Sequence, residues 1–192
     1  MTEQPADTPI PAWDASGVLR PTGKLAVHRQ GLRHPAISVF VLRGDRILIQ
    51  QRAAGKYHTP GLWANTCCTH PHWGEHAADC AGRRLAEELG IAGLDLRHVG
   101  QVEYRADVPG VREPLIEHEL VEVFVAEAPP QMAMSLDPAE VQAVRWVSLA
   151  DLRAQIARHP QMFTPWLRIY LQDHADMIFA GSPLGQTAEN LA

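Results

Sequence analysis

The stretch GEHAADCAGRRLAEELGI, residues 74–91, decides the fold of this 192-residue chain. Ala77, Ala81, Leu85 and Leu89 recur at the spacing that places apolar side chains on one face of a helix. Gly90 follows directly, at the position where a glycine commonly ends a helix. The pattern therefore predicts a helix that stops at Gly90.

Runs rich in β-branched and aliphatic residues predict strands on both sides of this helix. Before the helix, residues 36–52 read as two strands joined in a hairpin at Gly44-Asp45, and residues 60–70 as an irregular strand and loop. After it, further strands are expected in three segments, which are residues 96–106, 114–128 and 141–149. The end of the chain from Leu149 reads as mostly helical, with a break at residues 158–166.

These elements predict an α/β chain of the α+β type, with a mixed sheet flanked by helices. A hydrophobic content of 46% in 192 residues suits one sizeable core, so we expect one domain over residues 17–178. Residues 1–16, which are rich in Pro and Asp, are expected to form a flexible N-terminal arm. Residues 179–192 are expected to form a flexible C-terminal tail.

Composition excludes several classes of function. The formal net charge of -5 gives no broad basic surface, so no nucleic-acid partner is expected. No apolar run approaches the roughly 20 residues that span a bilayer, and the N-terminus lacks the layout of a secretion signal. The 3 cysteines, two of them adjacent, form no disulfide framework and fit a reducing compartment. We therefore expect a cytoplasmic protein without a membrane partner.

Chemistry-bearing residues gather in ANTCCTHPHWGEH, residues 64–76, and in IEHE, residues 116–119. Side chains alternate along a strand, so Glu117 and Glu119 are expected to share a face. By the same alternation Cys68 and His70 share a side and Cys67 points away. The histidines of HRQGLRH, at positions 28 and 34, lie just before the first predicted strand. Three imidazoles and two carboxylates would suit Zn²⁺, Mn²⁺ or Mg²⁺.

Each of these residues also has a purely structural interpretation. The 10 histidines of the chain can be scattered surface residues, and the Glu-x-Glu pair can line a solvated strand face. Cys68 can be a small buried apolar residue. Tyr104 and Trp166 can be core or rim residues.

The helical stretch resembles the Nudix box, which reads Gly, five residues, Glu, seven residues, Arg-Glu, apolar, any, Glu-Glu, any, Gly, apolar. The residues that match are Glu75, Arg83, Leu85, Glu87, Glu88, Gly90 and Ile91. Thr69 and Arg84 stand where the pattern has Gly and Glu. In Nudix hydrolases these helix carboxylates bind the Mg²⁺ that activates water, so Arg84 argues against ordinary hydrolysis. Arg83 with Glu87 and Arg84 with Glu88 are also helical salt-bridge spacings.

Separated motifs in the same order resemble the type I isopentenyl diphosphate isomerases, which have the Nudix fold. They are TGKLAVHRQGLRH, NTCCTHPHWGE, VEYRA, IEHE and TPW, and the resemblance runs from about Val18 to about Asp173. It implies a metal-dependent isomerisation of isopentenyl diphosphate to dimethylallyl diphosphate through protonation, a carbocation and deprotonation.

The resemblance also implies roles for individual residues. The metal ligands would be His28, His34, His70, Glu117 and Glu119, with Cys68 near the metal and Glu88 binding a second Mg²⁺ that arrives with the diphosphate. Glu119 beside Tyr104 would donate a proton. Cys68 would act from the opposite face, as a thiolate whose pKa is lowered. Substrate contacts would come from Lys24, Arg52, Lys56, Arg83 and, for the carbocation, Trp166.

Two other functions remain open from the sequence. One is a Nudix hydrolase of a nucleoside or prenyl diphosphate, and the other is a binding module with a structural metal site. The sequence leaves undecided which metal fills the His/Glu site and whether the chain is a monomer or a homodimer. It also leaves open the order of the proton transfers and the pathway that the product feeds.

Overall fold

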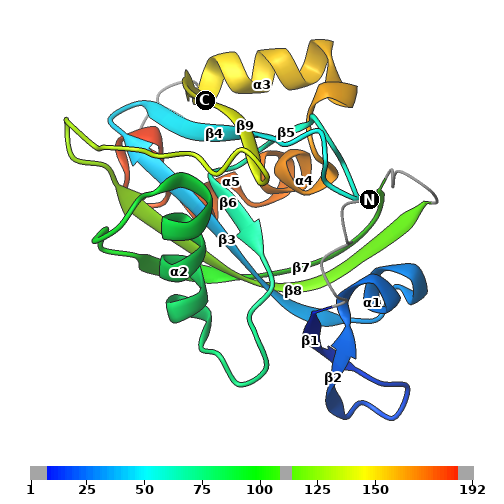
Figure 1. The fold of residues 1–192 in the computed structure, drawn as a ribbon. Coiled ribbons are helices and arrows are strands. Elements are labelled where there is room, and N and C mark those ends of the chain that lie inside the picture. Colours follow the sequence, from blue (N-terminus) through cyan, green and yellow to red (C-terminus); the bar gives the residue numbers. More distant parts are fainter. Residues whose placement is uncertain (1–7, 109–113, 186–192) are drawn as a thin grey trace.

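The computed structural model describes residues 8–108 and 114–185, and a 7-stranded mixed sheet forms its centre (Figure 1). The elements in chain order are β1 Pro9–Trp13, β2 Leu19–Gly23, α1 Lys24–Gln30, β3 His34–Arg43, β4 Arg46–Arg52, β5 Trp63–Ala64, β6 Cys67–Thr69, α2 Ala77–Leu89, β7 Arg97–Val108, β8 Leu115–Glu127, β9 Val141–Ser148, α3 Leu149–Arg158, the 3-10 helix Pro160–Met162, α4 Pro165–Asp173 and α5 Ala175–Phe179. The predicted α+β class and the mixed sheet flanked by helices are therefore confirmed.

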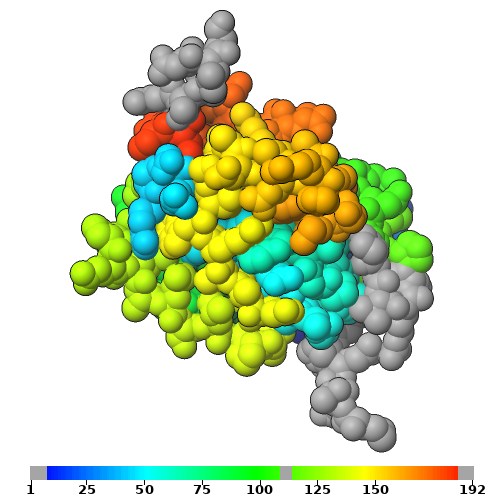
Figure 2. Space-filling model, turned by 90° about the horizontal axis from the view of Figure 1, so that it is seen from above, coloured from blue at the N-terminus to red at the C-terminus, as the bar shows by residue number. Residues whose placement is uncertain are grey.

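The main path of the sheet runs β5-β4-β3-β8-β7, with β6 paired to β3 and β9 paired to β4. Only the β3–β8 pair is parallel among the described strands, and the other pairs are antiparallel. The hairpin predicted at Gly44-Asp45 joins β3 to β4, where Arg43 pairs with Arg46. Figure 2 shows the molecule from above, where the yellow and orange surface of β9 and α3 adjoins the cyan surface of the segment that follows β4.

Both faces of β3 are buried, because helices cover the sheet on each side. Phe40 and Leu42 point into the core shared with α3, α4 and α5, whereas Val39 and Val41 point into the core beneath α2. This alternation is the period-2 pattern of a strand with two apolar faces. None of the helices in the described ranges, 8–108 and 114–185, has the length and apolar character needed to cross a membrane.

The two chain ends differ from the flexible segments predicted for them. Residues 9–13 form β1, which pairs with β2, and Ile10 is buried with Val27 of α1. Ile10 and Ala12 face a small apolar cluster of their own, which packs this strand against α1. At the other end Phe179 and Leu184 are buried in the core beside α4, so residues 179–185 do not form a frayed tail. Residues 1–7 and 186–192 lie outside the described residues, and the single domain over 17–178 stays a prediction.

Helix α2 ends as the sequence predicts. Gly90 adopts φ 66°, and Gly90 N and Ile91 N donate to the carbonyls of Ala86 and Leu85. The N–H of Ser135 donates to Leu89 O at 2.8 Å, which holds the loop before β9 against the end of the helix. A Cβ atom at residue 90 would lie 2.8 Å from Ser135 N, so this glycine is needed both for its backbone angle and for its size.

Gly90→Ala is expected to lower the free energy of unfolding more than Gly93→Ala. Gly93 also has a left-handed φ of +73°, but a Cβ atom added there would meet nothing within 4 Å. Gly93→Ala should therefore show only the backbone strain of about 1–2 kcal/mol, whereas Gly90→Ala adds the collision with Ser135. Urea denaturation of both variants measures the difference, and equal losses would contradict the steric argument.

Candidate functional site

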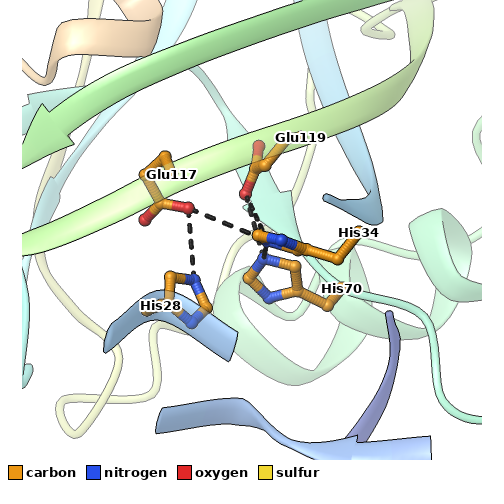
Figure 3. A group of neighbouring side chains, drawn as sticks. All are labelled: His28, His34, His70, Glu117 and Glu119. Carbon is orange, nitrogen blue, oxygen red and sulfur yellow. Dashed lines mark hydrogen bonds and ion pairs between the residues drawn. The ribbon is translucent and has the colours of Figure 1, made fainter. Parts of the chain in front are cut away.

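Three histidines and two glutamates converge at one end of the sheet, as the sequence predicts (Figure 3). His28 comes from α1, His34 begins β3, His70 follows β6, and Glu117 and Glu119 project from β8. One ligand atom of each residue lies within 4.8 Å of all the others. All five residues are buried.

Local structure explains why these residues meet. The parallel pairing of β3 with β8 places His34 directly opposite Glu119. Helix α1 ends at Gly31, with φ 61°, and a Cβ atom there would lie 2.9 Å from Ile116 of β8. The missing side chain thus lets the end of α1 approach β8 closely. His28 and His34 can therefore face the same point although their spacing is short.

The histidine tautomers suit a bound cation. The Nδ1 atoms of His28 and His34 lie 2.6 Å from Lys24 O and 2.7 Å from Leu32 O. A carbonyl only accepts, so both Nδ1 atoms carry the hydrogen and both Nε2 lone pairs face the cluster. His28 Nε2 is 3.2 Å from Glu117 Oε2, and within the described residues both are buried atoms without a hydrogen-bond partner. A divalent cation fits this donor set.

The two carboxyl groups of the cluster have opposite pKa shifts. Burial raises the pKa of Glu117, but the electrostatic effect of His28 and the contact with His58 together outweigh burial and hold the pKa of Glu117 well below its usual range. Burial, followed by the charge of Glu117, raises the pKa of Glu119. Tyr104 Oη donates to Glu119 Oε2 at 2.6 Å, while Glu119 Oε1 lies 2.9 Å from His70 Nε2. Glu119 is thus the carboxyl that more readily carries a proton.

Mn²⁺ is expected to stabilise the folded protein through this cluster. A ligand at one hundred times its dissociation constant stabilises by about 2.7 kcal/mol, which a shift in Tm reports. His70→Ala removes one of the five candidate ligands and should lose most of that shift, whereas the control His98→Ala should keep it, because the His98 ring pairs with Glu122 on the surface. Equal Mn²⁺ shifts for His70→Ala and the unmodified protein would contradict the assignment.

The adjacent cysteines lie on opposite sides of β6, as predicted. Cys67 is fully buried in the core beneath α2, whereas Cys68 is half-buried and packs against the other core. The Cys68 thiol donates to Asn65 Oδ1 at 2.9 Å, and its Sγ lies 2.8 Å from Ser38 Oγ. Ser38 Oγ in turn donates to Tyr170 Oη at 2.9 Å. Asn65 belongs to a motif noted in the sequence, but no role was predicted for Asn65, Ser38 or Tyr170.

The pKa of Cys68 is raised in the metal-free protein. Burial, aided by the charge of Glu119, raises the pKa of Cys68 to about 12. The group is therefore a thiol at neutral pH. The predicted low pKa refers to a thiol beside a bound metal ion and cations, and it stays a prediction.

Alkylation of Cys68 by iodoacetamide is expected to be slow at neutral pH in the metal-free protein. Because the raised pKa keeps the sulfur protonated below about 12, the thiolate fraction and the rate should rise about tenfold per pH unit. A variant with both Cys67→Ala and Cys80→Ala leaves Cys68 as the one remaining thiol of the 3 in the chain, so mass spectrometry reads Cys68 alone. A rate that is already maximal at pH 8 would contradict the raised pKa.

Four basic side chains lie beside the cluster. Burial, aided by the charge of Lys56, lowers the pKa of Lys24 to about 8, and Arg52 and Arg84 contribute to the same effect. Lys56 pairs with Glu140, and Arg84 Nη2 lies 3.3 Å from the other oxygen of Glu140. This cationic region contains the predicted Lys24, Arg52 and Lys56, and it adds Arg84.

Arg83 and Glu88 are already engaged by other residues of the chain. The Arg83 guanidinium binds Glu75 at 2.6 and 2.8 Å and Glu87 at 3.0 Å. Glu88 accepts from Arg84 at 2.6 Å and from Gln50 at 3.1 Å. The helical salt bridges that the spacing allowed are therefore present.

Trp166 is 3% exposed, and its ring lies 5.4 Å from the Arg52 guanidinium, measured to the ring centroid. His58 lies between this pair and the cluster, with its ring 6.1 Å from Trp166 and its Nε2 atom 3.0 Å from Glu117 Oε1. Burial, followed by the charge of Arg52, lowers the pKa of His58 to about 3. Sequence reasoning missed His58, because it stands in a loop where no spacing relates it to the other histidines.

Comparison with known proteins shows the family of this chain. The NUDIX domain model matches residues 32–167. The Isopentenyl-diphosphate Delta-isomerase of Rhodobacter capsulatus is 61% identical over 91% of this chain and 97% of its own length. The chain belongs to the isopentenyl-diphosphate Delta-isomerase family.

Another member of that family, from Cereibacter sphaeroides strain ATCC 17025, is 62% identical over 88% of this chain and 94% of its own length. Among solved structures, a MutT NUDIX hydrolase from Burkholderia pseudomallei has a TM-score of 0.55 and 24% identity, covering 74% of this chain and 98% of that one. At this identity the hydrolase supports the shared fold alone. The family resemblance inferred from the motifs is therefore confirmed.

Proposed function

We propose that this chain converts isopentenyl diphosphate to dimethylallyl diphosphate by moving one double bond. The relatives named above carry the name of that isomerase. The observation that carries the proposal is the buried carboxyl of Glu119, which binds Tyr104 through one oxygen and faces His70 with the other. A buried carboxyl with a raised pKa can give a proton to a weak base such as an alkene.

The reaction adds a proton to the terminal carbon at one end of the allyl unit. It removes another proton from the carbon at the other end, on the opposite face. In this proposal the proton of Glu119 goes to the terminal carbon, where the π electrons form the new C–H bond. The tertiary carbocation then loses a proton to Cys68, and the electrons of that C–H bond become the new double bond. A divalent ion at the five-residue cluster would stabilise the carboxylate that Glu119 becomes.

The protonation states of the pair set a condition on catalysis. Burial favours the neutral form of both Cys68 and Glu119 in the metal-free protein. The transfer needs one protonated and one deprotonated group, so Cys68 must lose its proton before it can act as the base. The cations around Lys24 favour that loss electrostatically.

Trp166 and the basic side chains would hold the substrate. The Trp166 ring already lies against the cation of Arg52, and a desolvated ring face of this kind stabilises positive charge by up to about 2 kcal/mol. Lys24, Arg52 and Lys56 would bind the diphosphate, with Mg²⁺ at Glu88 neutralising the rest of its charge. Arg84 is a better placed contact than Arg83, because it acts electrostatically on Lys24 while Arg83 binds Glu75.

The proposals for the metal ions, the cellular location and the assembly rest on the ligand atoms of the His/Glu cluster and on composition. We propose Mg²⁺ with the substrate diphosphate, and Mn²⁺, Zn²⁺ or Mg²⁺ at the His/Glu cluster, which offers the nitrogen and oxygen donors these ions accept. A cytoplasmic location is proposed because the cysteines are free. We propose one domain, a monomer or a homodimer, and no nucleic-acid or membrane partner.

The hydrolase alternative has less support. Arg84 stands where the Nudix box has a glutamate, and it donates to Glu87 at 2.8 Å and to Glu88 at 2.6 Å, so the helix lacks one of the carboxylates of that pattern. A binding module with a structural metal would explain the His/Glu cluster, but it assigns no role to the hydrogen-bonded thiol of Cys68.

Incubation with isopentenyl diphosphate in deuterated water tests the proposal. We expect dimethylallyl diphosphate with deuterium in its new methyl group, which proton NMR and mass spectrometry detect. Cys68→Ala should lower kcat by at least about 10²-fold, the lower bound for loss of a general acid or base. Cys67→Ala should keep most of the turnover, because Cys67 lies in the opposite core.

Three results would contradict the assignment. Release of phosphate from a panel of nucleoside diphosphates without isomerisation would favour the hydrolase. Tight metal retention with no turnover would favour the binding module. Loss of activity in Cys67→Ala but not in Cys68→Ala would show that the other thiol is catalytic.

A further inference from the structure

His58 lies in the loop between β4 and β5, with a side chain that is 7% exposed. The loop is closed by hydrogen bonds from Arg52 N to Leu62 O and from Gly61 N to Arg52 O. Arg52 Nη2 also donates to His58 O at 3.2 Å. The backbone at His58 is therefore fixed by the same arginine that lies over Trp166.

The two oxygens of Glu117 have different partners. Oε2 faces the cluster, 3.2 Å from His28 Nε2 and 4.0 Å from His34 Nε2. Oε1 lies 3.0 Å from His58 Nε2 instead. His58 itself is not among the residues whose ligand atoms lie within 4.8 Å of one another.

Glu119 is divided in the same way. Its Oε1 faces His70 at 2.9 Å and His34 at 3.7 Å, while its Oε2 accepts from Tyr104. Each carboxylate of the cluster therefore presents one oxygen to the histidines and has its second oxygen held by an outer group. His58 holds for Glu117 the place that Tyr104 holds for Glu119.

The direction of the His58 hydrogen bond follows from its neighbours. An ionised carboxylate only accepts hydrogen bonds, so His58 Nε2 must carry the hydrogen. Arg52 Nη2 lies 3.5 Å from both ring nitrogens and only donates, which leaves Nδ1 as the acceptor. One neutral tautomer satisfies both contacts.

We infer that His58 is a positioning residue that donates its Nε2–H to Glu117 Oε1 and so restricts Glu117 to binding a divalent ion through Oε2 alone. This inference rests on the metal site of the proposed function. An outer donor that orients a carboxylate ligand strengthens metal binding, and its loss typically weakens affinity about 10–100-fold. His58 is then a determinant of metal affinity without being a ligand.

Two substitutions separate the hydrogen bond from the packing. His58→Phe keeps a ring against Tyr57, which lies 4.4 Å away between centroids, but removes the donor. His58→Gln retains an N–H donor of similar reach. His118→Phe is the matched control, because His118 lies on the same strand as Glu117 but faces Gly31 O on the other side.

The measurement is the dissociation constant for Mn²⁺ alone, from the EPR signal of the free ion, without substrate. We expect weakening by about 10–100-fold for His58→Phe and affinity near that of the unmodified protein for His58→Gln and His118→Phe. Unchanged affinity in His58→Phe, or equal weakening in His58→Gln, would overturn the inference. If the unmodified protein binds no Mn²⁺, the metal site of the proposed function fails, and the inference fails with it.

A second measurement uses the unmodified protein, so it does not require a variant without His58 to fold. In the Zn²⁺-loaded protein with ¹⁵N-labelled histidine, we expect His58 to show a protonated Nε2 and an unprotonated Nδ1. An unprotonated Nε2 with the shift of a metal-bound nitrogen would make His58 a ligand and overturn its positioning role.

Discussion

The parallel pairing of β3 with β8 is the constraint on which the site depends. It joins segments far apart in the sequence and places His34 opposite Glu119. A shift of one residue would turn Glu117 and Glu119 to the other face of the sheet and leave His118 in their place. The alternation along β8 opposes such a shift, because it would also turn Val121 and Val123 out of the core and Glu122 into it. Packing of the core and geometry of the cluster are thus fixed by one register.

The same pairing helps to bury the site, and burial shifts the pKa values of its residues. Burial raises the pKa of both Glu119 and Cys68, so it favours the neutral forms of the two groups that would exchange protons with a substrate in the proposed function. Glu117 differs because His28 faces it directly and lowers its pKa. Two carboxyl groups separated by one residue on one strand are therefore suited to different tasks, one to holding a cation and one to carrying a proton.

Local patterns in the sequence predicted the elements whose signal is periodic, such as α2 with Gly90 and the hairpin at Gly44-Asp45. Alternation along the strands predicted that Glu117 and Glu119 share a face and that the two cysteines diverge. The sequence could not reveal β1, because its partner and its small apolar cluster are tertiary features. The burial that raises the pKa of Cys68 in the metal-free protein is likewise a tertiary feature, since it depends on what packs around a residue and not on its neighbours in sequence. His58 was missed because a loop gives no periodic signal.

Arg84 explains how a Nudix helix can serve a site that needs cations as well as carboxylates. By pairing with Glu87 and Glu88, it neutralises the acidic end of α2, and it reaches Glu140 as well. The carboxylates of β8 are faced mainly by imidazoles, which can bind the same metal ion. Lys24 lies within the electrostatic influence of both groups, because Lys56, Arg52 and Arg84 lower its pKa while Glu117 raises it. In the proposed function, an anionic head would be drawn to these cations while a hydrocarbon tail would extend toward the carboxyl of Glu119.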